Sequence, residues 1–132
     1  MSGVLFDTNA LLFMVSRSER VASKVGDLAQ RARWVSKVCA IEIAIKFGLG
    51  KLTLPPPFHT SFGRAFNQAV DSLGAEVLPI DMAHIEMLSH LPPHHRDPFD
   101  RLIIAQALAE NLTVVTRDSA FALYPGLDVY EI

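Results

Sequence analysis

The sequence is poor in the features that mark secreted, membrane-embedded and highly charged proteins. Its one cysteine, Cys39, cannot form an internal disulfide bond, so a reducing, cytoplasmic location fits best. No apolar run approaches the roughly 18 residues of a membrane-spanning helix, and the N-terminal residues include an early acid and no basic stretch, unlike a signal peptide. The formal net charge of −2 provides no overall attraction to nucleic acid or membrane, so any polyanion must bind to a local patch.

The sequence also lacks a linker, an internal repeat and a low-complexity tract, which favours a single domain over residues 1–132. Hydrophobic residues make up 50% of the chain and the mean hydropathy is +0.27, which excludes a disordered protein. A globular chain of this length buries roughly two thirds of its unfolded surface, enough for a sizeable core.

Short β-compatible segments alternate with helical patterns along the chain. The expected strands are 3–6, 34–38, 76–80, 112–116 and 127–132. The expected helical segments are 8–15, 18–33, 40–50, 60–74, 82–91, 98–111 and 117–125. This alternation predicts an α/β fold: a three-layer α/β/α domain with helices on both faces of a short, mostly parallel central sheet.

Capping residues and prolines predict where several of these segments begin. Thr8 or Asn9 can cap the first helix, and Asp81 and Asp97 directly precede two later ones. The three prolines at 55–57 are incompatible with a helix interior, so the segment 53–58 is expected to be a connection.

Several acidic side chains are expected at one edge of the sheet. Asp7 closes the first strand, and Asp118 comes two residues after the fourth. Asp97 and Asp100 begin the helix that leads into that fourth strand. Because the helix and the strand run antiparallel, the start of the helix lies at the carboxyl edge of the sheet, which is where open parallel sheets bind ligands.

A further acid, Glu42, lies in a helix that is apolar nearly all round, so its carboxylate is expected to be partly buried. A buried carboxylate needs a partner, which Lys46, four residues on, or a metal ion can supply. Each acid alone has an ordinary explanation as a cap or a turn residue. Together the acids repel one another unless a cation lies among them, and an all-oxygen ligand set suits Mg²⁺ or Mn²⁺.

Carboxylate-bound Mg²⁺ activates water and braces an in-line phosphoryl displacement. This chemistry also needs groups that contact the phosphate backbone. Arg96, Arg101 and Arg117 flank the acids in sequence and are candidates for contact with a polyanion. Thr116 and Asn9 are candidate hydrogen-bond donors to a water molecule or a phosphate oxygen.

Two other groups of residues have weaker functional interpretations. Six further basic residues fall between Arg17 and Lys37, where they either extend a positive track or form a solvated helix face. His94 and His95 lie in a proline-flanked loop, so they are expected to be exposed to solvent; among functional roles, contact with a substrate phosphate is favoured over metal binding.

Four segments, in this order and spacing, resemble the PIN-domain family, and more narrowly the toxin nucleases of bacterial VapBC-type toxin–antitoxin pairs. They are LFDTNALL (5–12), AIEIAIKFGLGKL (40–52), HHRDPFDRLIIAQALAEN (94–111) and LTVVTRD (112–118). The resemblance covers essentially the whole chain. Its most specific part is RDPFDRLIIAQA followed by VTRD.

The resemblance implies a Mg²⁺- or Mn²⁺-dependent endoribonuclease that hydrolyses RNA by metal-activated water. It also implies a homodimer and inhibition by a cognate antitoxin whose tail enters the active-site groove. The implied acidic site is Asp7, Glu42, Asp100 and Asp118, of which Asp7, Asp100 and Asp118 hold the metal, with Asn9, Thr116 and Asp97 in support. Relatives often carry His at the position of Asn9 and Trp at that of Ile41; these departures leave every carboxylate in place and affect the shape of the groove.

Two alternatives compete with this interpretation. A receiver-like or phosphatase domain also uses clustered acids and Mg²⁺, but it requires a lysine after a late strand, where this chain has Arg117. A non-catalytic PIN-like domain would bind RNA or a partner protein only. Four negative charges facing the phosphates of RNA argue against such a domain.

Overall fold

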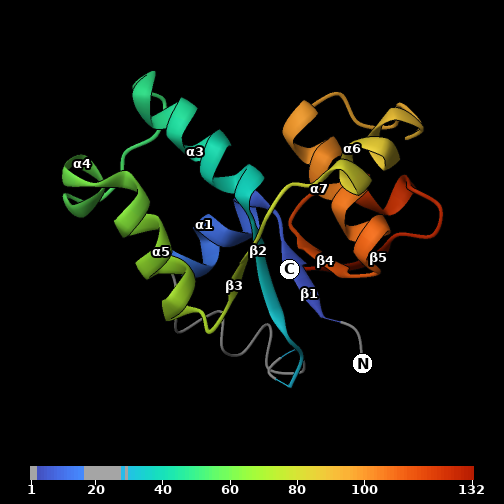
Figure 1. Cartoon of the computed structure of the whole chain (residues 1–132), viewed down its shortest axis with the longest axis horizontal. Coiled ribbons are helices and arrows are strands. Elements are labelled where there is room, and N and C mark those ends of the chain that lie inside the picture. The colour runs from blue at the N-terminus through green and yellow to red at the C-terminus, as the bar shows by residue number, and fades with distance from the viewer. Residues whose placement is uncertain (1–2, 17–27, 29) are drawn as a thin grey trace.

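The computed structural model describes residues 3–16, 28 and 30–132 and contains a five-stranded sheet in which every pairing is parallel (Figure 1). The strands are β1 (Val4–Phe6), β2 (Arg33–Ser36), β3 (Glu76–Leu78), β4 (Thr113–Thr116) and β5 (Asp128–Glu131), in the order β3-β2-β1-β4-β5. The chain crosses from β3 to the far side of β1, so the strand order reverses between β1 and β4. Ligands bind at such a switch point in open α/β sheets.

The helices cover both faces of the sheet, which confirms the expected three-layer α/β/α architecture. They are α1 (Thr8–Ser16), α3 (Lys37–Gly48), α4 (Pro57–Thr60), α5 (Phe62–Ser72), α6 (Met82–Ser89) and α7 (Pro98–Glu110), with a 3₁₀ helix, η2 (Ser119–Leu123). Figure 1 shows α1, α3, α4 and α5 on one side of the strands, and α6 and α7 on the other. Among the described residues, no helix is both long and apolar enough to cross a membrane.

The central strands are buried on both faces because helices cover each of them. Val4, Leu5, Val114 and Val115 are fully inaccessible to solvent. Continuous apolar runs of this kind are typical of strands buried in parallel sheets, and burying each such side chain contributes about 1.5–3 kcal/mol to stability. The core therefore lies directly beneath the strand ends that carry the acids.

Several helix limits differ from those expected. The cap of α1 is Asp7, whose Oδ1 accepts the Ala10 N–H at 2.7 Å, and not Thr8 or Asn9. The expected strand at 34–38 ends at Ser36, because the Ser36 hydroxyl accepts the Val38 N–H and starts α3 there.

The expectation that the proline-rich segment 53–58 is only a connection is wrong at its end, where a helix begins. Pro57 is the first residue of α4, a position where its missing N–H costs nothing. The helix expected at 18–33 falls mainly on residues outside the described part of the chain, and its last residue, Arg33, begins β2.

Candidate active site

Asp7 lies at the end of β1, is 2% exposed and is held by two short hydrogen bonds. The Thr116 hydroxyl, at the end of β4, donates to Asp7 Oδ2 at 2.5 Å, and the Ala10 N–H donates to Oδ1. Burial raises the pKa of Asp7, and the negative charges of Asp118 and Glu42 add to this, while the two hydrogen bonds oppose it. The carboxylate is therefore firmly oriented in a setting that disfavours its negative charge.

Asp118 follows β4 and caps η2. Its Oδ1 accepts the Ala120 N–H at 2.9 Å, and its own N–H donates to Thr116 Oγ1 at 3.0 Å. The hydrogen bond from Ala120, followed by the one from His95, lowers the pKa of Asp118. Unlike Asp7, this carboxylate is stabilised in its charged form.

Asp100 lies in the first turn of α7. Asp97 caps this helix as expected: its Oδ1 accepts the backbone N–H groups of Phe99 and Asp100 at 2.8 and 3.1 Å. Burial raises the pKa of Asp100 to about 7, and the charges of Asp97 and Asp7 contribute further. Burial is the main cause of this raised pKa, and the neighbouring carboxylates add to it.

Glu42 reaches the same region from α3 and is 4% exposed, as its apolar helix indicated. The Thr8 hydroxyl donates to Oε1 at 2.6 Å, and Lys46 Nζ donates to Oε2 at 2.7 Å. The bond to Glu42 raises the pKa of Lys46. The expected Glu42–Lys46 pair is confirmed, whereas the contact with Thr8 joins residues 34 positions apart and has no local sequence signal.

The donor set of this acidic cluster fits a hard divalent cation. Asp7, Glu42, Asp100 and Asp118 come from four different elements or element ends, and Asp7 and Asp100 each experience the charge of Glu42. Each oxygen that accepts one hydrogen bond keeps a second lone pair for a ligand. Carboxylate oxygens are the ligands that Mg²⁺ and Mn²⁺ prefer. A cation here would offset the repulsion among these carboxylates, which adds to the effect of burial on the pKa of Asp100.

His95 is the residue of this site that the sequence prediction missed. Its side chain is 14% exposed, not solvated, and its Nε2 lies 2.8 Å from Asp118 Oδ2 and 3.2 Å from Asp100 Oδ2. The ligand atoms of these three residues all lie within 4.8 Å of one another. The available signal was its place two residues before the cap of α7, where its Nδ1 accepts the N–H of Asp97.

The three candidate arginines differ in their contacts. Arg101 donates to the carbonyl oxygens of Leu91 at 3.2 Å and Pro92 at 2.9 Å, so it fixes the loop before α7. Arg96 and Arg117 are exposed.

The basic run between Arg17 and Lys37 gains no support as a track toward the acids. Residues 17–27 lie outside the described part of the chain. Arg31 donates to Thr113 and Arg33 to the Leu73 carbonyl oxygen, near the opposite ends of the strands.

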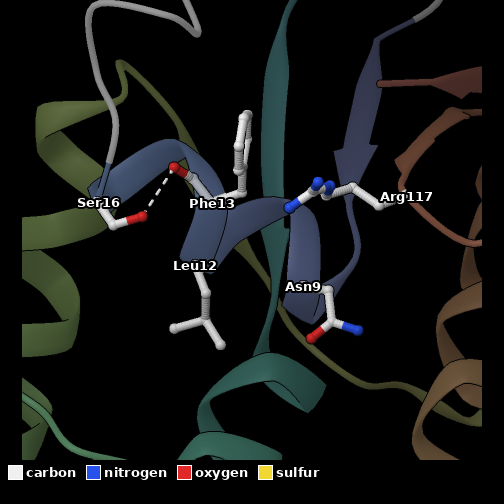
Figure 2. A pocket seen from close by; sticks show the side chains of 5 residues that line it. All are labelled: Asn9, Leu12, Phe13, Ser16 and Arg117. Atoms are coloured by element: carbon white, nitrogen blue, oxygen red, sulfur yellow. Dashed lines mark hydrogen bonds between the residues drawn. The ribbon is translucent and has the colours of Figure 1, made fainter.

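A pocket of about 550 Å³ lies next to the acids, because Asn9 and Arg117, which are close to Asp7 and Asp118 in the sequence, form part of its lining. Its lining residues are Asn9, Leu12, Phe13, Ser16 and Arg117 (Figure 2). The guanidinium carbon of Arg117 lies 4.3 Å from the centroid of the Phe13 ring, a cation–π contact that orients this positive charge. Asn9 and Arg117 thus offer hydrogen-bond donors beside the acidic cluster.

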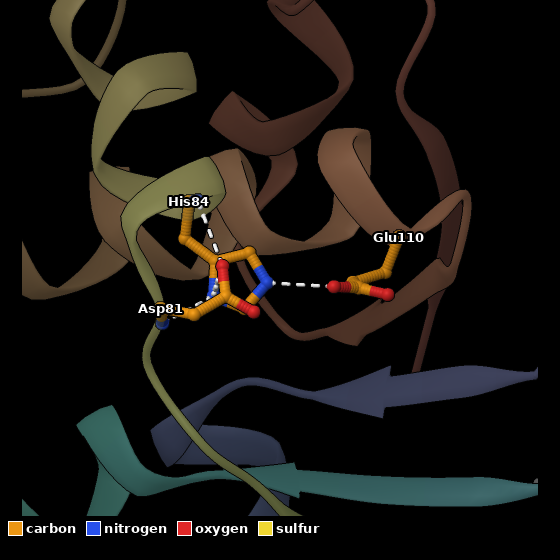
Figure 3. A group of neighbouring side chains, drawn as sticks. All are labelled: Asp81, His84 and Glu110. Atoms are coloured by element: carbon orange, nitrogen blue, oxygen red, sulfur yellow. Dashed lines mark hydrogen bonds and ion pairs between the residues drawn. The ribbon is translucent and has the colours of Figure 1, made fainter.

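A second group of possible metal ligands, Asp81, His84 and Glu110, has a structural explanation (Figure 3). The expected cap of α6 is confirmed: Asp81 accepts the N–H groups of Ala83 and His84, and His84 Nδ1 accepts the Asp81 N–H at 3.1 Å. His84 Nε2 lies 2.9 Å from Glu110 Oε1. Both ring nitrogens are therefore occupied by protein groups, and this group joins α6 to the end of α7.

The chain belongs to the PIN domain family, whose model matches residues 4–127. A similar fold occurs in DNA-bound VapBC from Salmonella typhimurium, with a TM-score of 0.73 and 21% sequence identity over 99% of this chain and 98% of that chain. Another occurs in FitAcB from Neisseria gonorrhoeae, with a TM-score of 0.68 and 22% identity over 97% of this chain and 96% of that chain. VapBC-5 from Mycobacterium tuberculosis is a third example, with a TM-score of 0.63 and 20% identity over 99% of this chain and 98% of that chain. At these identities the likeness shows the fold. No curated protein sequence matches the chain.

Proposed function

We propose that this protein is a divalent-metal-dependent endoribonuclease and the toxin of a toxin–antitoxin pair. The observation that carries the proposal is that carboxylates from four separate parts of the chain interact with one another: Asp7 with Asp118 and Glu42, and Asp100 with Asp7 and Glu42. Membership of the PIN domain family supports it. Three structural neighbours are described as VapBC, VapBC2 and VapBC-5, the last as a member of the VapBC family of toxin–antitoxin systems.

In this proposal Asp7, Asp100 and Asp118 hold Mg²⁺ or Mn²⁺. When bound, the ion activates a water molecule and stabilises negative charge on the phosphodiester. Thr116 orients Asp7 through its hydroxyl group, and Asp97 places Asp100 by capping α7. These contacts preorganise the carboxylates before substrate arrives.

Glu42 completes the acidic site, and hydrogen bonds prevent its carboxylate from rotating freely. Thr8 and Lys46 each donate to one of its carboxylate oxygens, which fixes its orientation, and its negative charge acts on Asp7 and Asp100. Lys46 partly balances the negative charge on the α3 side of the cluster.

RNA contacts are assigned to the exposed donors around the acids. Arg96, Arg117 and Asn9 contact the phosphate backbone, while Arg101 acts indirectly by fixing the loop that contains Arg96. Arg117 is already held over Phe13, which lowers the entropy lost on binding.

The proposal extends to the setting of the protein. We assign it a cognate antitoxin protein as inhibitor, a homodimeric state, a single domain over residues 1–132 and a cytoplasmic location. The structural neighbours include a toxin–antitoxin complex from Klebsiella pneumoniae, which supports the antitoxin partner.

The test is RNA cleavage by the purified protein. Cleavage is expected with Mg²⁺ or Mn²⁺ and is expected to stop with EDTA. Asp7→Asn and Asp100→Asn should each reduce the rate by about 100-fold or more, because a bound metal contributes several kcal/mol to catalysis. Asp71→Asn, on the exposed surface of α5, is the matched control and should cleave normally. Unchanged cleavage by both site variants would refute the site, and metal-independent RNA binding without cleavage would indicate a binding domain instead.

A further inference from the structure

His95 is held by protein contacts at its backbone and at its ring. Its N–H donates to the Tyr124 hydroxyl at 2.9 Å, and its carbonyl oxygen accepts from Arg101 at 3.4 Å. Its ring meets Phe121 edge-on, with the centroids 5.7 Å apart and the planes at 87°. A side chain held in this way has little freedom to change the direction of its nitrogens.

The contacts of the two ring nitrogens define where the proton of the neutral imidazole lies. Nδ1 accepts the backbone N–H of Asp97 at 3.1 Å. A nitrogen that accepts an N–H carries no proton of its own, so the proton of the neutral ring is on Nε2. Nε2–H then points at Asp118 Oδ2 and, at a longer distance, Asp100 Oδ2.

This arrangement is the reverse of that found for histidines that bind metals. A metal-binding histidine offers a lone pair to the metal and usually donates its other N–H to a carbonyl or carboxylate oxygen. In His95 the nitrogen near the carboxylates bears the proton, and the other nitrogen already accepts a hydrogen bond. For Nε2 to bind a metal, the proton would have to move to Nδ1, where it would face the Asp97 N–H.

We propose that His95 is a positioning residue, which acts as a hydrogen-bond donor to Asp118 and Asp100 and is not itself a metal ligand. Asp118 Oδ1 is held by the Ala120 N–H, so a donor to Oδ2 fixes the carboxylate at both oxygens. A donor shared between two carboxylates also reduces their repulsion without occupying a coordination position. The inference about the tautomer is independent of the proposed function, whereas the effects of His95 on Mg²⁺ binding and on RNA cleavage rest on that function.

The first test is nitrogen NMR of the histidine rings in the wild-type protein. The metal-free protein is expected to show His95 with the proton on Nε2, and the same tautomer is expected to remain after saturation with Mg²⁺. A proton on Nδ1 would overturn the inference. So would a nitrogen coupling assigned to His95 in pulsed electron paramagnetic resonance spectra of the Mn²⁺-loaded protein. These measurements give the same answer whether or not the protein cleaves RNA.

The second test compares two variants of His95 with a histidine outside the site. His95→Gln keeps an N–H donor on the side chain, whereas His95→Ala removes it. By the scale of effects known for residues that orient metal ligands, His95→Ala should weaken Mg²⁺ binding about 10- to 100-fold in calorimetry, and His95→Gln should restore most of this loss. His90→Ala, at an exposed site at the end of α6, is the control and should bind Mg²⁺ as the wild type does.

The comparison of the two variants separates positioning from the other roles. Equal loss in His95→Gln and His95→Ala, with both proteins folded, would contradict a donor role. Wild-type Mg²⁺ affinity in His95→Ala would show that the contact has no effect on the site. If the metal binds as expected but no RNA is cleaved, the proposed function fails and the role of His95 stands.

Discussion

Thr116 links the carboxylate of Asp7 to the backbone of Asp118 at the centre of the candidate site. Its hydroxyl donates to Asp7 at 2.5 Å and accepts the N–H of Asp118 at 3.0 Å, so one side chain orients residues from both sides of the switch point. Thr116 is fully buried, and without its hydroxyl Asp7 Oδ2 and the Asp118 N–H would each lose this hydrogen bond.

Thr116→Val is expected to reduce Mg²⁺ affinity or RNA cleavage about 10- to 100-fold and to lower the free energy of unfolding by about 1–3 kcal/mol. Thr113→Val is the matched control, since Thr113 lies at the other end of β4 and donates to Asp128 at 2.6 Å. It should lose comparable stability in urea titrations while keeping wild-type cleavage. Equal activity losses in the two variants would show that Thr116 acts through stability alone.

At the scale of the elements, helix ends decide which groups reach the site. Asp97 and Pro98 start α7, so Asp100 falls in its first turn. Asn111 ends the same helix in the left-handed region, with φ 55°, and leads directly into β4. The two ends of α7 therefore place Asp100 at the acidic cluster and Glu110 beside α6.

The cap of α6 should contribute to stability and not to the candidate active site. Asp81→Ala is expected to lower the free energy of unfolding by about 1 kcal/mol, which corresponds to a decrease in Tm of about 2–5 °C. Asp81→Asn keeps an acceptor for the Ala83 N–H and should lose much less. Because this cap lies near Glu110, at the other end of α7 from Asp100, RNA cleavage should be unchanged (Figure 3). Loss of cleavage in a folded Asp81→Ala protein would contradict this separation.

At the scale of the whole molecule, the candidate site and the core are parts of one structure. Cys39 in α3 is completely buried, and its Sγ lies 3.7 Å from the carbonyl oxygen of Phe6, the residue before Asp7. The packing of α3 on β1 therefore stabilises the end of the strand that carries Asp7. Opening this packing would disturb both the core and the site.

The rate at which the Cys39 thiol reacts provides a measure of global unfolding. Burial raises the pKa of its thiol to about 12, well above pH 8. At pH 8 the thiolate is then roughly one part in ten thousand, and thiolate is the reactive form. Iodoacetamide should label the folded protein only through unfolding, at a rate that rises with urea, and Mg²⁺ should slow labelling if it binds the folded state. Rapid labelling that is independent of urea would show that α3 opens locally.

Local patterns in the sequence were sufficient for much of the fold and part of the site. The caps at Asp81 and Asp97 and the pairing of Glu42 with Lys46 were all predicted, since each involves residues no more than four positions apart. Alternating strand and helix patterns predicted the α/β layers. The β–α rhythm also placed Asp7 at the carboxyl edge.

Only the tertiary structure decided which distant groups meet. His95 bonds to Asp118, 23 positions away, and Thr8 to Glu42, 34 positions away. Arg101 was assigned to substrate because it flanks the acids in sequence, and the structure shows its guanidinium group donating to the carbonyl oxygens of Leu91 and Pro92. Local sequence determines hydrogen bonds that close within one helical turn, because the backbone geometry alone brings those atoms together. Contacts across elements depend on how the helices pack on the sheet, which is a property of the whole core.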